Sequence, residues 1–317
     1  MRIQNKFKYF CWAALLLALL AFAGCTRPEL TPGTLVRETA DLLLETDPAT
    51  GSDWSAFALA RCNSESSPEW FDRYYAAVEA RVTQCGGVLH ERKYTEYSRL
   101  ILALTALGED PTNVAGYNLL LPLADFEQTV FQGVNGAIMA LLALDSGNYE
   151  IPNNPAAPTQ ATRELYLEFI LAAQLPGGGW SLAGEEAEID LTAMAIQALA
   201  NYRDREDVVQ AIEDALTVLS QRQNNRGGYT AYNTDSSEAV SQTIIALAAL
   251  EIPLEDPQFV KDGRSLLDAL RDFRQQGGGF AHLLDGETDL LATEQALCAL
   301  IALVRMEQGR GPLYQIR

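Results

Sequence analysis

Two carboxylate residues, Asp190 and Glu238, stand at the beginning of long apolar segments of the chain. A carboxyl group held protonated in such a setting could act as a general acid that delivers a proton to a substrate. An aspartate in this position also caps helices, because its side chain accepts hydrogen bonds from unpaired backbone N–H groups. The helix cap is the simpler interpretation of Asp190, and the general acid is the alternative.

The chain has few residues that could bind a metal or act as a reactive thiol. It has two histidines, His90 and His282, and five cysteines, none of them in CxxC spacing. Because zinc sites need several such ligands together, we expect no metal site. Cys298 lies within an apolar Ala-Leu segment. Cys62 and Cys85 could form a disulfide or stay buried as free thiols.

A glycine-rich stretch, QLPGGGW at residues 174–180, is a third candidate, since such loops can cradle phosphate groups. It lacks the GxxxxGK[ST] pattern, and it recurs at 223–229 and 274–280, about 50 residues apart, which is the spacing of a helix-pair repeat. We therefore predict tight joints between an outer and an inner helix, which glycine permits. The predicted joint residues are Gln174, Gly178, Trp180, Gln223, Gly227, Tyr229, Gly278 and Phe280.

The elements that must carry these residues are helices of two kinds. Helices that are apolar on every face, and therefore buried on all sides, are predicted near 55–60, 98–107, 136–144, 191–200, 241–250 and 292–303. Amphipathic helices alternate with them near 35–46, 68–84, 112–124, 160–174, 205–222 and 257–274. This alternation predicts an all-α fold, an (α/α)6 toroid of six inner and six outer helices over residues 35–317. An open solenoid would leave its terminal apolar helices exposed.

A toroid also predicts where a ligand would bind. The N-terminal ends of the inner helices converge on one mouth, so the side chains there line a concavity. Aromatic, amide and carboxyl groups in this place suit a small amphipathic ligand, although each could instead be a cap or turn residue. The predicted ligand-binding residues are Trp54, Tyr97, Asn135, Asp190, Glu238, Ser241 and Thr293.

The joints resemble the glutamine-tryptophan motif of the terpenoid cyclase and protein prenyltransferase toroid superfamily. Its pattern Q-x3-G-x-W is met by Gln174, Gly178 and Trp180, and in relaxed form by the second repeat, while Arg274 replaces the glutamine in the third. The resemblance covers nearly all of residues 35–317 and implies the toroid fold. It implies no single function, because folds of this kind host unrelated activities.

The enzyme branches of that superfamily match only in part. Class II terpene cyclases protonate an alkene with the middle carboxylic acid of a DxDD motif. The corresponding run here, 188–191, keeps Asp190 in the middle but has Leu191 in the last place. Protein prenyltransferases hold zinc with Asp, Cys and His, and Cys298 has no D-x-C partner here. A terpenoid cyclase or prenyltransferase-like enzyme with Asp190 as general acid is therefore the alternative hypothesis.

Two other branches are more similar. Secreted cobalamin carriers such as intrinsic factor and transcobalamin share the toroid, and Asp190 followed by Thr192 resembles their ligand-facing helix start. Glu238 and Ser241 occupy the places of an Asn and a Ser there, but Ala187 stands where the carriers have their cobalt-binding histidine. Bacterial surface proteins with such a toroid are also similar. The resemblance implies a binding or interaction module, with a corrinoid as one candidate ligand.

The N-terminus carries a targeting pattern. Three basic residues precede the apolar run 11–22, so residues 1–24 are predicted to be a signal peptide. Ala23, Gly24 and Cys25 resemble the bacterial lipobox, which makes Cys25 the predicted lipidation site and 25–34 a polar tether. We expect a lipid-anchored protein on the extracellular face of the bacterial cell membrane. A secreted protein with a spare Cys25 thiol is the alternative.

Charge excludes one class of partner. The chain carries a formal charge of −19, and its first 24 residues hold three basic and no acidic groups, so the rest has 20 basic against 42 acidic groups, or −22. Nucleic acids are excluded, since phosphate binding needs clustered Lys and Arg. The hypotheses are a lipid-anchored module that binds a small amphipathic ligand or another surface protein, the enzyme, and a surface scaffold without a ligand.

Overall fold

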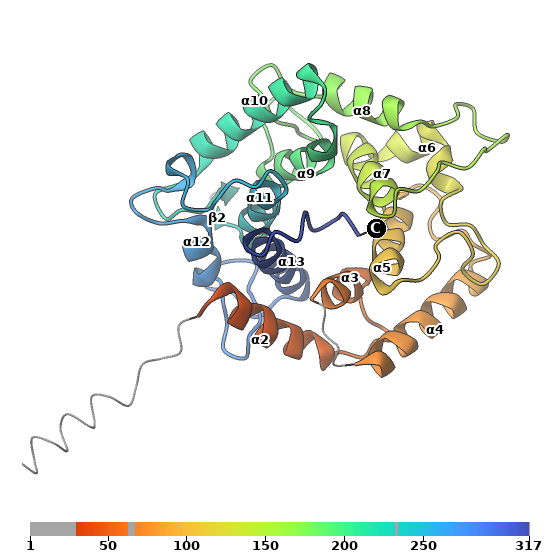
Figure 1. Cartoon of the computed structure of the whole chain (residues 1–317), viewed down its shortest axis with the longest axis horizontal. Coiled ribbons are helices and arrows are strands. Elements are labelled where there is room, and N and C mark those ends of the chain that lie inside the picture. Colours follow the sequence, from red (N-terminus) through yellow and green to blue (C-terminus); the bar gives the residue numbers. More distant parts are fainter. Residues whose placement is uncertain (1–29, 63–66, 232–233, 317) are drawn as a thin grey trace, which may run out of the picture.

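The computed structural model describes residues 30–62, 67–231 and 234–316, which form a closed double ring of helices (Figure 1). The inner helices are α3 (Asp53–Arg61), α5 (Thr95–Leu107), α7 (Val134–Ser146), α9 (Ile189–Leu199), α11 (Ser237–Ala249) and α13 (Leu290–Glu307). The long outer helices are α2 (Pro32–Leu44), α4 (Pro68–Gln84), α8 (Arg163–Ala172) and α10 (Glu206–Arg222), with the short α12 (Leu266–Asp272). The predicted all-α toroid is confirmed.

Two outer positions differ from the sequence prediction. A helix over 112–124 was expected, but the chain turns there, with left-handed backbone at Ala115 (φ 50°) and Gly116 (φ 88°). The third outer position is filled by short helices, η1 (Pro122–Ala124), α6 (Phe126–Thr129) and η2 (Val130–Gln132). The helix expected over 257–274 is likewise interrupted between η4 (Pro257–Phe259) and α12, because Asp262 (φ 50°) and Gly263 (φ 75°) reverse the chain.

Smaller elements complete the described chain. The 3-10 helix η3 (Ala200–Tyr202) extends α9, and the strands β1 (Thr230–Ala231) and β2 (Thr234–Asp235) pair antiparallel ahead of α11. Helix α2 begins at Pro32, inside the predicted tether, because proline is tolerated in the first turn of a helix and the Thr31 side chain caps it. Cys62 and Cys85 are free thiols.

Contacts between the first and last helices close the ring. Each inner helix packs against the next, and α13 packs against both α3 and α2. The Ser55 hydroxyl of α3 donates to the Glu294 carboxyl group of α13 at 2.5 Å. Behind this seam, the Arg274 guanidinium bonds Glu38 of α2, also at 2.5 Å. The open solenoid is therefore excluded.

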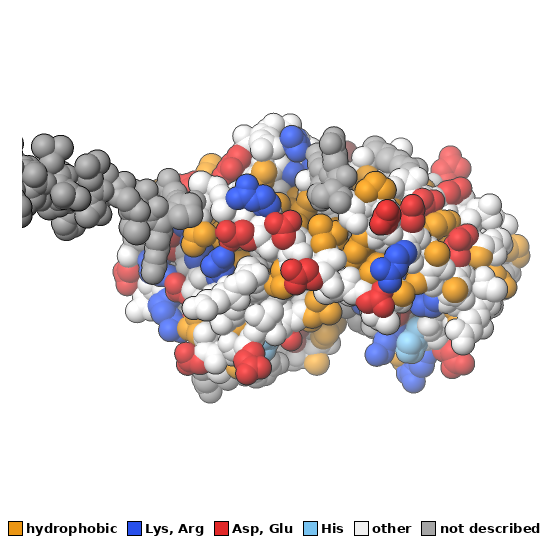
Figure 2. Space-filling model, turned by 90° about the horizontal axis from the view of Figure 1, so that it is seen from below, with side chains coloured by type: hydrophobic (Ala, Val, Ile, Leu, Met, Phe, Trp, Pro, Cys, Tyr) orange, Lys and Arg blue, Asp and Glu red, His pale blue; other side chains and the backbone are white. Residues whose placement is uncertain are grey.

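The two faces of the ring differ in which ends of the inner helices they carry. We call the face where the inner helices begin the N-terminal mouth and the face where they end the C-terminal mouth. The last described residues, 308–316, leave α13 and cross the C-terminal mouth toward the middle of the ring (Figure 1). Seen edge-on, over α2 and α4, the ring carries acidic and basic side chains interspersed with apolar ones (Figure 2).

Within the described residues, no single helix is both long and apolar enough to cross a membrane. Only one bent pair, Phe126–Gln132 with Val134–Ser146, satisfies the length and composition test when both arms are combined.

Candidate functional site at the N-terminal mouth

The glycine-rich joints connect neighbouring helix pairs. The Gln174 side chain donates from its Nε2 forward to the Ala211 carbonyl of α10 at 2.8 Å. Gln223 repeats this contact on the Phe259 carbonyl, and Arg274 repeats it on Glu38. Each joint therefore ties one outer helix to the next, and the third joint ties the last to the first.

The aromatic residues of the joints are also structural. Trp180, Tyr229 and Phe280 are fully buried. The Trp180 indole N–H donates to the Ile170 carbonyl of α8 at 2.7 Å, and its backbone N–H donates to the Thr192 hydroxyl at 3.0 Å. Because these side chains have no exposed surface, they cannot contact a ligand.

Asp190 lies in the first turn of α9 and is exposed. The helix begins one residue earlier, after Glu188, so Asp190 is not its N-cap. Its carboxylate forms no hydrogen bond or ion pair among the described residues.

Glu238 has partners at the mouth. Its carboxylate accepts a hydrogen bond from the Ser236 hydroxyl at 2.8 Å and pairs with His282 Nδ1 at 2.8 Å. His282 belongs to the connection between α12 and α13, and its carbonyl accepts the Ser237 N–H. Glu238 therefore joins two neighbouring turns while keeping part of its side chain exposed.

The other five predicted site residues divide into two groups. Trp54 and Asn135 are half-buried, and the Asn135 Oδ1 acceptor is enclosed without a hydrogen-bond partner. Tyr97, Ser241 and Thr293 are buried. The Tyr97 hydroxyl accepts the Leu89 N–H, and the Thr293 hydroxyl accepts the Phe280 N–H, both at 3.0 Å. Trp54 thus keeps exposed surface for a ligand, together with Glu238 and Asp190, whereas the Asn135 Oδ1 is enclosed.

Exposed apolar side chains gather around this mouth, which the sequence analysis did not predict. Phe131, Leu182, Leu290 and Leu291 are between 46% and 57% exposed, and Val88 and Leu283 belong to the same set of connections. Phe131 lies in η2, directly before α7, and the others lie in an outer-to-inner connection or in the first turn of α13. We call these six residues the apolar rim. Exposed apolar side chains that recur on one face of a ring are candidates for contact with a ligand.

Contacts between turns hold the rim in place. The Arg92 guanidinium lies 4.0 Å from the centre of the Phe131 ring. Nearby, the Thr95 hydroxyl donates to the Gln132 side chain at 3.1 Å. Leu182 reaches the start of α7, close enough to touch a Cβ placed on Gly133. Phe131 and Leu182 are therefore held by contacts between turns, which lowers the entropy cost of binding there.

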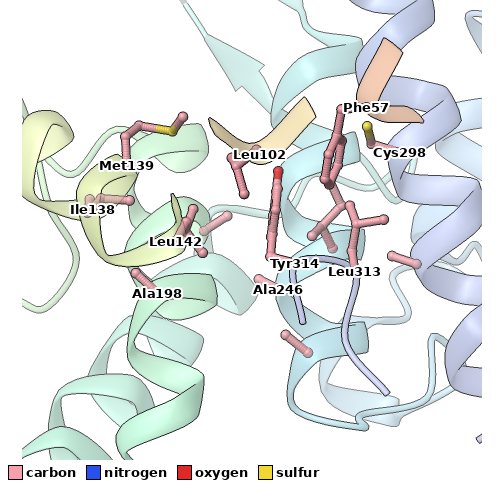
Figure 3. Packing of buried hydrophobic residues seen from close by; sticks show 14 of the residues in the cluster. Phe57, Leu102, Ile138, Met139, Leu142, Ala198, Ala246, Cys298, Leu313 and Tyr314 are labelled. Carbon is pink, nitrogen blue, oxygen red and sulfur yellow. The ribbon is translucent and has the colours of Figure 1, made fainter. Parts of the chain in front are cut away.

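The floor beneath the mouth comes from the C-terminal segment. Tyr314 points along the ring axis toward the N-terminal mouth with its hydroxyl leading, between Phe57, Leu102 and Leu142 (Figure 3). Its ring stacks on Phe57 with centroids 5.3 Å apart. Burial raises the pKa of the Tyr314 phenol well above its usual value. No motif in the sequence indicated that this segment enters the ring.

Four contacts fasten the segment to the C-terminal mouth. Arg61, the last residue of α3, donates to the carbonyls of Gln315 at 3.0 Å and Pro312 at 3.5 Å. The Ile316 N–H donates to the carbonyl of Ser146 at the end of α7, and the Gln315 side chain bonds Asn201. The segment therefore covers the C-terminal mouth of the ring.

A buried acid was also missed by the sequence analysis. Glu294 of α13 is only 2% exposed, and burial raises its pKa above the usual value although Ser55 donates a hydrogen bond to it. Its carboxyl group lies in the seam between α13 and α3. Among the described residues, no cluster of His, Cys, Asp and Glu could hold a metal ion.

Comparison with known proteins agrees with this architecture. The chain matches the family model of the prenyltransferase alpha-alpha toroid domain over residues 137–216 and 207–310. It also resembles the crystal structure of a protein from Actinoplanes, with a TM-score of 0.55, 16% sequence identity, and coverage of 87% of this chain and 99% of that one. That similarity shows the fold alone. No curated protein matches the chain. With the family model covering more than half of its length, the chain belongs to the prenyltransferase α-α toroid domain family.

Proposed function

We propose that this protein binds a small, neutral amphipathic ligand at the N-terminal mouth. The observation that carries the proposal is the apolar rim, because its six exposed apolar residues lie just before or at the starts of inner helices, at the face opposite the C-terminal segment. An apolar ligand body would cover them, at about 25 cal/mol for each Å² removed from water. The excess of acidic groups disfavours an anionic ligand.

Polar groups at the same mouth suit the edges of such a ligand. The partly exposed Glu238 carboxylate is a hydrogen-bond acceptor, so it favours a ligand that presents N–H or O–H donors. A corrinoid, with apolar faces and amide edges, is one specific member of this class. Titration with cobalamin and with cobinamide, followed by corrinoid absorption and by thermal unfolding, tests that member. Absence of both changes would exclude it.

The general proposal is tested with the fluorescent probe prodan, a neutral naphthalene with a carbonyl group at one end. Replacing Leu182 and Leu291 together by serine should raise its Kd about tenfold or more. Covering two half-exposed leucines contributes roughly 1 kcal/mol each, and 1.4 kcal/mol corresponds to tenfold. Val209→Ser is the control, since Val209 is an exposed apolar residue on the outer helix α10. Equal Kd values for all three proteins would refute binding at the mouth.

We further propose that the protein is exported and anchored through a lipid on Cys25. The support is the sequence pattern alone, because Cys25 lies outside the described residues. Cys25→Ser should move the protein from the membrane fraction to the soluble exported fraction, whereas Cys85→Ser, which alters a free thiol of the ring, should leave it in place. Membrane retention of the Cys25 variant would contradict the anchor.

A further inference from the structure

The hydroxyl group of Tyr314 has no partner within the ring. Tyr314 is 9% exposed, and its hydroxyl makes no hydrogen bond with any described residue. Among the apolar side chains drawn in Figure 3, Phe57 and Leu102 lie beside the upper part of its ring. A phenol hydroxyl inside a protein normally finds a hydrogen bond to protein, water or ligand.

The position of the hydroxyl determines what could pair with it. It points along the ring axis toward the N-terminal mouth, and the segment that carries it is held by α3 and α7 on the opposite face (Figure 3). Trp54 packs edge-on against Phe57 at 5.8 Å, and Phe57 stacks on Tyr314. This aromatic series leads from the mouth to the hydroxyl.

We propose that the C-terminal segment is part of the ligand site, and that Tyr314 donates a hydrogen bond to an oxygen acceptor at the buried end of the ligand. This inference rests on the proposed function and deepens it. The ligand has an apolar body that contacts the rim and the aromatic series. Its leading end carries a carbonyl, ether or hydroxyl oxygen, and Tyr314 selects for that oxygen. A hydrocarbon end would leave the phenol unpaired.

The experiment compares two probes of similar shape. Prodan carries a carbonyl acceptor, and 2-dimethylaminonaphthalene lacks it. Because the contacts that close the ring lie within residues 30–316, the protein is used without its first 24 residues and with Cys25→Ser. The variant is Tyr314→Phe, which keeps the ring that stacks on Phe57. Tyr117→Phe is the control, since Tyr117 is exposed and lies outside the ring axis.

We expect Tyr314→Phe to raise the Kd of prodan about three- to tenfold, to shift its bound emission to the blue through loss of a hydrogen bond, and to leave the Kd of 2-dimethylaminonaphthalene unchanged. Tyr117→Phe should change none of these values. If prodan binding depends on Leu182 and Leu291 but neither its Kd nor its emission responds to Tyr314→Phe, the role of Tyr314 is wrong and the mouth site stands. If binding does not depend on the two leucines, both proposals fall.

Discussion

Replacing Gly278 by alanine would probe the seam at which the ring closes. Gly278 has a left-handed backbone (φ 95°), and a Cβ placed on it would lie 2.7 Å from the Glu38 carbonyl oxygen of α2. Its own carbonyl accepts the Thr39 hydroxyl of α2 at 2.9 Å. The neighbouring Gly277 has the same φ, but nothing lies within 4 Å of a Cβ placed there.

The two glycines separate backbone strain from contact with α2. Alanine in the left-handed conformation costs about 1–2 kcal/mol at either position. At Gly278 the clash with α2 adds about 1–3 kcal/mol, as over-packing does in a close-packed interior. Gly277→Ala should therefore lower the free energy of unfolding by about 1–2 kcal/mol, and Gly278→Ala by about 2–5 kcal/mol.

Urea unfolding followed by circular dichroism would measure both variants beside the wild-type protein. The difference between the variants isolates the contact that joins the last joint to the first outer helix. Equal destabilisation would mean that α2 does not pack against residue 278, and the closed ring would then be wrong at its seam. A lower m-value for Gly278→Ala alone would indicate that the native ring has partly opened.

Three further predictions concern polar groups, of which Tyr166 and Glu294 are buried and Asp268 is half-buried. Tyr166→Phe should lower the free energy of unfolding in urea by about 1–3 kcal/mol, because its hydroxyl donates to the Leu123 carbonyl at 2.5 Å and the change leaves that carbonyl unpaired. Tyr314→Phe removes a hydroxyl without a partner, so it should leave the free energy of unfolding almost unchanged. Similar losses of stability in the two variants would contradict the assignment of partners. Glu294→Gln should raise Tm at pH 8, because burial raises the folded-state pKa of Glu294 and its ionised form is therefore destabilising above that pKa. The gain should vanish as pH falls below the unfolded value near 4.5. Asp268→Asn should instead lower Tm at neutral pH. Burial raises the pKa of Asp268, but hydrogen bonds from Ser265 and the charge of Arg271 outweigh burial and lower it. The wild-type protein is therefore the more stable one at neutral pH, and this difference in Tm is lost on acidification. A gain for Glu294→Gln that does not depend on pH would refute the ionisation argument.

The inner helices could be predicted because their signal is local. Segments such as 136–144 and 241–250 are apolar on all faces, and only a buried position satisfies such a helix. The recurring glycines predicted the joints for a similar reason, since consecutive glycines interrupt any helix. The third and sixth outer helices were less predictable. Half-exposed segments containing Asp-Pro can begin a helix or a turn, and packing decides between them.

The candidate site was predicted only in outline. Its position at the mouth was predicted from the repeat, and Trp54, Asn135 and Glu238 lie there with partly exposed side chains. Burial separated them from Tyr97, Ser241 and Thr293, whose residue types look equally suitable. The exposed leucines of the rim could not be predicted, because the sequence alone does not tell whether an apolar residue in a loop is buried or faces solvent.

By itself, the sequence determined the all-α class, the alternation of buried and half-exposed helices, and the period of the joints, since each depends on residues that are near one another in the chain. Tertiary structure alone decided that Arg274 meets Glu38, that Glu294 is enclosed beside Ser55, and that Tyr314 forms the floor of the ring. These contacts join residues more than 230 positions apart, and they form only when the ring closes. No local pattern encodes that closure, because its driving force is the burial of the first and last apolar helices against each other.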